Sequence, residues 1–259
     1  MRGSGGTRTV ERAKMGGVTS SSDPANAPAQ SSAARRNPLG MPVVGMIGGG
    51  QLARMTQPAA LALGQSLRVL AASESESSAQ STPDVILGSF DSLEDVQRFA
   101  AGCDVVTFDH EHVPQEHLAE LVASGVNVQP PPQALLHAQD KLVMRTRLAE
   151  LGAPVPAFAP VETPEDAVRF LTENGGTAVL KARRGGYDGK GVWMLTSVED
   201  AHAITTEQLA AGVPLMVEQR VFWRRELSAL VARSPFGQGA VWPVVETIQQ
   251  GGICHTVIA

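Results

Sequence analysis

The stretch LKARRGGYDGKGVWML, residues 180–195, places cations and four glycines between two apolar segments. Glycine lets the backbone approach a ligand closely, so its N–H groups can surround phosphate oxygens. Lys181 can add a charge-assisted hydrogen bond to a phosphate, worth roughly 1.5–3 kcal/mol. The spacing is not that of a Walker P-loop, because Arg184 stands at the first required glycine and Gly191 at the Ser/Thr position. We predict a glycine-rich hairpin that folds over phosphates, with a plain exposed hairpin as the alternative.

Acidic residues after the next apolar segment could complete a nucleotide site. In VEQRV (217–221), Glu218 and the backbone of Val221 can offer a carboxylate and a backbone pair to a ribose and a base. Glu226 is a second acid at the start of the following predicted strand. Each acid taken alone is more typical of a surface charge.

A glycine turn near the start of the folded sequence, Gly48-Gly49-Gly50, follows a predicted strand and opens a predicted helix. Unpaired amides at a helix start can bind an anion. Ala53 fits the last position of the dinucleotide fingerprint, but the second strand ends in AAS (71–73) without the expected acid. A phosphate-bearing ligand other than NAD(P) is therefore favoured, and a merely structural turn stays open.

Four ionisable side chains follow a predicted buried strand in FDHEHVP (108–114), where open α/β sheets bind their ligands. Strand alternation sends His110 and His112 to one side and Glu111 to the other, and Pro114 interrupts the segment before His117. A metal site is therefore disfavoured. A ligand-contacting acidic loop and a solvated loop both remain possible readings of these residues.

The elements that must position these residues change character along the chain. Short apolar runs at 43–47, 67–71, 84–88 and 104–108 alternate with helical patterns, which indicates a parallel α/β sheet and a Rossmann-like domain over 41–133. A long helix is expected over 134–151, followed by helices near 163 and 199–211 and strands at 178–182, 192–195 and 215–219. Segments 226–232 and 240–246 are expected to form a hairpin, so the fold becomes α+β.

Composition narrows the class of protein. The chain has 259 residues, 43% hydrophobic content, a formal net charge of -5 and two cysteines, Cys103 and Cys254. The charge gives no general attraction to nucleic acid, no apolar run approaches the ~18 residues of a membrane span, and the cysteines fit no zinc spacing. We expect a cytoplasmic protein. Residues 1–40 are small, polar and proline-bearing, which predicts a disordered tail or an expression-derived segment.

Taken in order, these motifs resemble the ATP-grasp superfamily and, within it, the 5-(carboxyamino)imidazole ribonucleotide synthase family. The resemblance covers residues 43–259 and is carried by GMIGGGQLARM, VVTFDHEHVP, HAQDKLVMR, VLKARRGGYDGKGV, VEQRV, RRELSALVAR and WPVVETIQQGGIC. It implies a Rossmann-like pre-ATP-grasp domain, an ATP-grasp small lobe over 134–214 and the start of a large lobe over 215–259. It also implies a ligase that uses ATP and bicarbonate to carboxylate aminoimidazole ribonucleotide in purine biosynthesis, acting as a homodimer.

The resemblance assigns roles to residues by their place in the motifs. Tyr187 and Asp188 would be catalytic and reach toward the imidazole amine and bicarbonate. Aminoimidazole ribonucleotide would contact Gly50, Gln51, Leu52 and Glu111. ATP would contact Lys141, Lys181, Gly186, Tyr187, Asp188, Gly189, Lys190, Gly191, Val192, Glu218, Gln219, Val221 and Glu226.

The resemblance also implies Mg²⁺, whose expected ligands would lie beyond Ala259, so that no metal ligand is assigned within this chain. We therefore expect this stretch of chain to be inactive by itself and a longer form to be competent. Two other functions stay open: a different ATP-grasp ligase or carboxylase, and a nucleotide-binding module without catalysis. A nicotinamide-dependent oxidoreductase is less favoured.

Overall fold

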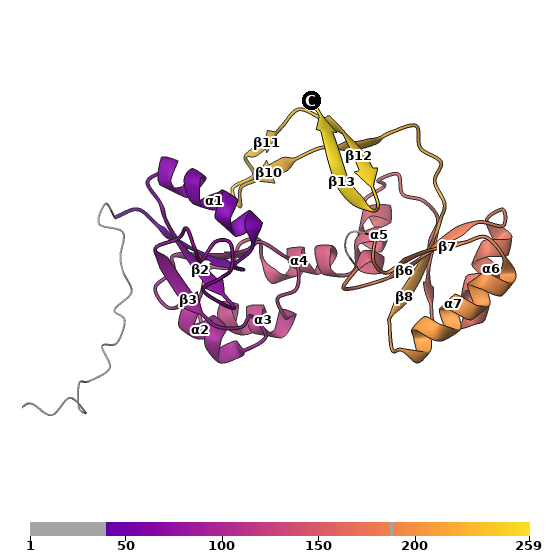
Figure 1. Cartoon of the computed structure of the whole chain (residues 1–259), viewed down its shortest axis with the longest axis horizontal. Helices are drawn as coiled ribbons and strands as arrows, with labels where there is room; N and C mark the ends of the chain where they lie inside the picture. The colour runs from indigo at the N-terminus through magenta and orange to yellow at the C-terminus, as the bar shows by residue number, and fades with distance from the viewer. Residues whose placement is uncertain (1–39, 187–188) are drawn as a thin grey trace, which may run out of the picture. The chain divides into compact units, whose positions relative to one another are not determined.

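The computed structural model describes residues 40–186 and 189–259, and Figure 1 shows the order of the elements. The expected tail over 1–40 therefore lies outside the described residues except for Gly40. Among the helices of the described ranges, none is long and apolar enough to cross a membrane.

The first part of the chain is a parallel four-stranded sheet with strand order β3-β2-β1-β4. Its strands match the apolar runs of the sequence to within a residue, which confirms the predicted parallel α/β arrangement. The bounds are β1 Val43–Ile47, α1 Gln51–Ala62, β2 Ser66–Ala71, β3 Asp84–Leu87, α2 Leu93–Ala100, β4 Val105–Phe108 and α3 Gln115–Ala123.

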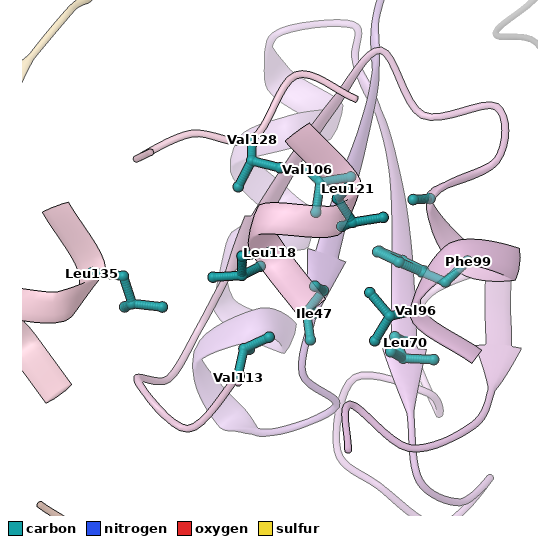
Figure 2. Packing of buried hydrophobic residues seen from close by; sticks show 11 residues of the cluster. Ile47, Leu70, Val96, Phe99, Val106, Val113, Leu118, Leu121, Val128 and Leu135 are labelled. Carbon is teal, nitrogen blue, oxygen red and sulfur yellow. The ribbon is translucent and has the colours of Figure 1, made fainter. Parts of the chain in front are cut away.

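Alternation along the strands divides the core of this sheet into two layers. Ile47 and Leu70 face α2 and α3, where they meet Phe99 and Leu118 in a buried cluster (Figure 2). The neighbouring residue Met46 belongs to a second cluster, formed with α1. The sheet is thus covered on both faces, as a parallel sheet requires.

Helix α1 packs on the sheet through small residues and not through its large apolar residues. Leu52, Met55 and Leu63 are each more than 60% exposed, whereas Ala53 and Ala60 are buried. Small side chains let the helix approach the sheet closely, so residue size outweighs hydrophobicity at this contact. The helix itself is confirmed.

The predicted long helix is two helices, α4 Pro132–Gln139 and α5 Lys141–Glu150, which meet at Asp140. The Asp140 side chain accepts hydrogen bonds from Leu142 N at 3.0 Å and Val143 N at 3.3 Å, so it caps α5. Leu135 of α4 belongs to the core of the first domain. This domain therefore extends past the boundary expected at residue 133.

The second domain contains an antiparallel sheet with strand order β5-β8-β6-β7. One face packs on α6 and α7, which lie side by side (Figure 1). Because β8 pairs with β5 and β6, this sheet continues past the lobe boundary expected at residue 214. The bounds are β5 Phe158–Val161, α6 Pro164–Glu173, β6 Ala178–Ala182, β7 Val192–Leu195, α7 Val198–Ala210 and β8 Leu215–Gln219.

The last part of the chain is made of short antiparallel strands. The turn near Gly237 joins β10 to β11, but β9 pairs with β12 instead, so only the inner part of the predicted hairpin forms. β12 and β13 form a further hairpin around Gly251 and Gly252. No residue in the described segment 220–259 is buried. The bounds are β9 Glu226–Ser228, β10 Val231–Arg233, β11 Gly239–Val241, β12 Val245–Gln250 and β13 Ile253–Ile258.

Candidate functional site

A pocket of about 680 Å³ lies on the face of the second sheet opposite its helices. Alternation along β6 directs Leu180 into the core and Lys181 into this pocket, and along β7 it separates Leu195 from Met194 in the same way. Six residues predicted to bind ATP line the pocket: Lys181, Val192, Glu218, Gln219, Val221 and Glu226.

The charged floor of the pocket is an ion-pair triad. Glu218, which is 6% exposed, accepts hydrogen bonds from Lys181 Nζ at Oε1 and from Arg145 Nε at Oε2, the latter at 3.0 Å. Burial alone would raise the pKa of Glu218, but the bonds from Lys181 and Arg145 outweigh it and lower the pKa below its ordinary value. Glu218 is therefore ionised at neutral pH, and the triad carries a net positive charge.

The remaining wall of the pocket is apolar. Val179, Val192 and Met194 come from the sheet, and Phe222 lies in the segment after β8. The guanidinium of Arg220 lies 4.8 Å from the centroid of the Phe222 ring. An apolar wall beside a cationic floor suits a ligand that has a flat base at one end and negative charge at the other.

Lys141 lies at the first position of α5, next to the glycine hairpin. Its Nζ donates to the carbonyl oxygen of Gly186 at 3.5 Å, and its backbone N donates to Arg183 O at 3.0 Å. Burial and the charge of Lys181 lower the pKa of Lys141. The proximity of the two lysines fits their predicted shared role toward phosphates, although Lys141 does not line the pocket described above.

Asp140 attaches this helix start to the hairpin. Arg183 contacts both of its carboxylate oxygens, at 3.1 and 2.7 Å, and Arg184 Nε lies 3.4 Å from Oδ2. Burial would raise the pKa of Asp140, but the bonds from Arg183 and the backbone amides lower it overall. The buried carboxylate of Asp140 therefore connects the start of α5, where Lys141 lies, to Arg183 at the base of the hairpin.

The glycine-rich segment connects β6 to β7 as a hairpin, as predicted. Gly191 has a φ of +70° and Gly186 leaves no room for a side chain, because an added Cβ would lie 2.7 Å from Lys190 O. Glycine is therefore favoured at Gly191 by the backbone conformation and at Gly186 by the lack of space for a side chain. The predicted catalytic residues, Tyr187 and Asp188, lie outside the described residues.

A second pocket, of about 400 Å³, lies at the first glycine turn and is lined by Gly50, Gln51 and Leu52, three of the predicted substrate residues. Two carboxylates approach the turn. Asp109 Oδ2 accepts from Ala53 N at 3.2 Å, and Glu76 Oε2 accepts from Ala72 N at 3.1 Å.

One amide in the first turn of α1, that of Ala53, is thus already bonded to a carboxylate of the protein, that of Asp109. The surrounding carboxylates favour ligand groups that donate hydrogen bonds. The glycines are needed for close approach by these acids: a Cβ on Gly48 would lie 1.7 Å from Asp109 Oδ1.

Glu111 is placed apart from the other predicted substrate residues. It lines a different pocket, together with His112 and Arg184. His110 instead lines the pocket at the glycine turn, and its pKa is lowered mainly by burial, with Asp109 acting in the opposite direction. Within residues 40–186 and 189–259, no group of three or more His, Cys, Asp or Glu side chains could hold a metal ion.

Sequence reasoning missed Arg145 and Asp109. Arg145 follows Lys141 by one helical turn, a spacing that places both on one side of α5, and this was an available signal. Asp109 stands in the acidic segment that was considered, but no local pattern showed that it would fold back onto the glycine turn.

Two family models match the chain over nearly all of its described length. The ribonucleotide synthetase preATP-grasp domain matches residues 41–139, and the ATP-grasp domain matches residues 146–259. The fold is therefore a pre-ATP-grasp domain followed by ATP-grasp sequence, as predicted.

Comparison with individual relatives points to one family of ATP-grasp enzymes. The chain is 57% identical over 225 residues to the N5-carboxyaminoimidazole ribonucleotide synthase of Mycobacterium leprae, covering 84% of this chain and 51% of the relative. It is 54% identical over 220 residues to the enzyme of the same name from Corynebacterium ammoniagenes, covering 85% and 53%. The predicted resemblance to this family is confirmed, and the chain spans about half the length of these curated relatives.

A solved structure agrees with these relatives. The N5-carboxyaminoimidazole synthase from Aspergillus clavatus, in complex with ADP and 5-aminoimidazole ribonucleotide, superposes with a TM-score of 0.73 at 30% identity. The match covers 84% of this chain and 56% of that one.

Proposed function

We propose that this chain contributes the nucleotide pocket and part of the ribonucleotide pocket of an ATP-grasp ligase. The reaction converts 5-aminoimidazole ribonucleotide, ATP and bicarbonate to 5-(carboxyamino)imidazole ribonucleotide, ADP and phosphate. The observation that carries the proposal is the cationic triad on the floor of an apolar-walled pocket, beside a glycine hairpin. The similarity to the N5-carboxyaminoimidazole ribonucleotide synthases supports the choice of substrate.

In this proposal ATP lies in the pocket of about 680 Å³, with its base against the apolar wall and its phosphates toward Lys181 and Lys141. The glycine hairpin covers the phosphates with backbone N–H groups. An oxygen of bicarbonate attacks the γ-phosphorus, the bond to the β-phosphate oxygen breaks, and ADP leaves. The two lysines offset the negative charge that collects on the phosphate oxygens.

The second step transfers the carboxyl group. The exocyclic amine of the ribonucleotide attacks the carboxyl carbon of carboxyphosphate, phosphate leaves, and the amine loses a proton. Carboxyphosphate is labile in water, so a hairpin that excludes water protects it until the amine attacks. The motif resemblance assigns the catalytic roles in this step to Tyr187 and Asp188.

The pocket at the first glycine turn is proposed for a part of the ribonucleotide that donates hydrogen bonds. Asp109 and Glu76 are acceptors there, and Gly50 and Gln51 also line the pocket. Hydroxyl or amine groups of the substrate suit these acceptors better than its phosphate does. Glu111 belongs to the proposed substrate residues only through the motif, because it lines another pocket.

Magnesium commonly accompanies ATP in such reactions, but among the described residues no group of three or more His, Cys, Asp or Glu side chains could hold it. The proposal therefore routes no step through a metal held by this chain. The homodimer rests on the resemblance and the cytoplasmic location on the composition, and both belong to the same proposal. Sedimentation velocity of the purified chain tests the homodimer.

The function is tested with a chimera in which the remaining half of the Mycobacterium leprae relative follows residue 259. The chimera should release ADP only when both the ribonucleotide and bicarbonate are present, and the same chimera with Lys181→Met should not. ADP release without the ribonucleotide in a well-folded chimera would instead favour a different ATP-grasp enzyme. ADP binding without any turnover would favour a nucleotide-binding module.

A further inference from the structure

Arg145 is a cation of the nucleotide pocket that the motifs do not assign. It lies on α5, one turn after Lys141, and lines the pocket with Lys181 and Glu218. Its Nε donates to Glu218 Oε2 at 3.0 Å, and its side chain is only 22% exposed. The pairing joins residues 73 positions apart in the sequence, so it is a tertiary contact and not a product of helix spacing.

The two oxygens of Glu218 are bound by two different cations. Lys181 holds Oε1, and Arg145 holds Oε2. In the proposed function Lys181 must turn toward the phosphates when nucleotide binds, which removes one partner from a carboxylate that is almost fully buried. A buried charge that loses its last partner is strongly unfavourable, whereas a charge that keeps one partner is not.

We propose that Arg145 is a positioning residue that holds the Glu218 carboxylate in place while Lys181 moves to the nucleotide phosphates. This role rests on the proposed function. Arg145 starts from a fixed position, because α5 is capped by Asp140 and its first backbone N–H donates to Arg183 O at 3.0 Å. Arg145 can therefore keep its contact with Glu218 while Lys181 moves from Glu218 to the phosphates.

The charged groups around Glu218 are few enough that the role of Arg145 can be tested separately from that of Lys181. Lys181 faces it from β6 and Arg145 from α5, and Arg220 and Glu226 line the same pocket from the segment after β8. The paired position on β5 is Phe158, which does not titrate. Removal of Arg145 therefore leaves Lys181 as the one direct ion-pair partner of Glu218 among the described residues.

The test is a double-mutant cycle on ADP affinity, measured by calorimetry with the 259-residue chain. Arg145→Gln should weaken ADP binding at least about tenfold, and Arg145→Lys should recover most of the loss. In a Glu218→Gln background, Arg145→Gln should cost less than about twofold, since no buried carboxylate then needs a partner. The exposed neighbour Arg147, which pairs with Glu150, gives the control: Arg147→Gln should leave the affinity within about twofold.

An equal loss in both backgrounds would overturn the positioning role, and so would an unchanged affinity in Arg145→Gln. The proposed function fails separately, if the folded wild-type chain binds no ADP. In that case the interaction between Arg145 and Glu218 is tested without nucleotide, by NMR titration of the Glu218 carboxyl carbon. Its midpoint should rise in Arg145→Gln, and an unchanged midpoint would contradict the role of Arg145.

Discussion

The two pockets each contain a buried carboxylate at the end of a strand, and the two carboxylates are satisfied in different ways. Glu218, on β8, has a cation on each oxygen. Asp109, after β4, accepts one backbone N–H from Ala53 through Oδ2. Among the described residues, no donor lies within hydrogen-bond range of its buried Oδ1, and His110 Nε2 is 4.0 Å away.

This difference indicates what each pocket is built to receive. The Glu218 pocket has surplus positive charge, so an anionic ligand can take over Lys181 while Arg145 remains. The Asp109 pocket has surplus acceptors, so a ligand that brings N–H or O–H groups is favoured there. A glycine-rich turn at a helix start is thus not sufficient to define a phosphate site, because a carboxylate of the protein can occupy an amide there, as Asp109 does with Ala53 N.

The largest effect is expected from Lys181→Met, which removes a cation proposed to bind phosphate but keeps a side chain of similar length. ADP affinity should fall by about 10- to 100-fold, from the loss of a charge-assisted bond worth roughly 1.5–3 kcal/mol. Calorimetry measures this directly. Asp109→Asn in the other pocket is the matched control and should leave ADP affinity within about twofold; equal losses in both variants would remove the distinction between the pockets.

Gly48→Ala should destabilise the fold by about 2 kcal/mol. The new Cβ would clash with Asp109 Oδ1, and the φ of +131° is unfavourable for alanine. Gly125→Ala is the control, since Gly125 has a φ of +89° but nothing within 4 Å of an added Cβ. It should cost about 1 kcal/mol in chemical denaturation. Similar losses for both variants would show that the approach of Asp109 to the turn is unimportant.

Asp109→Asn should weaken binding of 5-aminoimidazole ribonucleotide by about fivefold, which corresponds to roughly 1 kcal/mol. The amide oxygen can still accept from Ala53 N, but the amide nitrogen replaces an acceptor with a donor. Competition binding with the ribonucleotide measures the change. Unaltered affinity would exclude Asp109 from the substrate pocket.

The smallest effect concerns stability in acid. The pKa of Glu218 is below its ordinary value of 4.5, so its stabilising contribution is fully present above about pH 4.5 and is lost as the pH falls through the lower folded-state pKa. The difference in unfolding free energy between wild type and Glu218→Gln should therefore shrink in this acidic range. Parallel pH profiles for the two proteins would contradict the ion-pair triad.

Much of this architecture was predictable because it depends on local patterns. The strand over 215–219 and the hairpin around Gly191 follow from apolar runs and glycine spacing. The break at Asp140 was missed, because the helical periodicity continues through it and the cap is seen only in three dimensions. The buried face of α1 was also hidden, since a pattern of hydrophobicity does not register that Ala53 can pack more closely than Leu52.

The partners of the site were less predictable than its elements. The motif resemblance selected Lys181 and Glu218, but it did not show that they pair with each other, or that Arg145 completes the triad. Such contacts join distant segments, and their existence depends on the register of β6 against β8. The sequence therefore predicted which residues would line the nucleotide pocket better than it predicted how their charges would be balanced.

The central claim is that nucleotide phosphates bind at Lys181 and Lys141. Competitive acetylation with and without ADP, read by mass spectrometry, tests it residue by residue, and an unrelated lysine-containing peptide added to both samples serves as the internal reference. The account predicts that ADP lowers the acetylation of Lys181 and Lys141 severalfold and leaves that of the reference peptide unchanged. Acetylation of Lys181 that is the same with and without saturating ADP would contradict it.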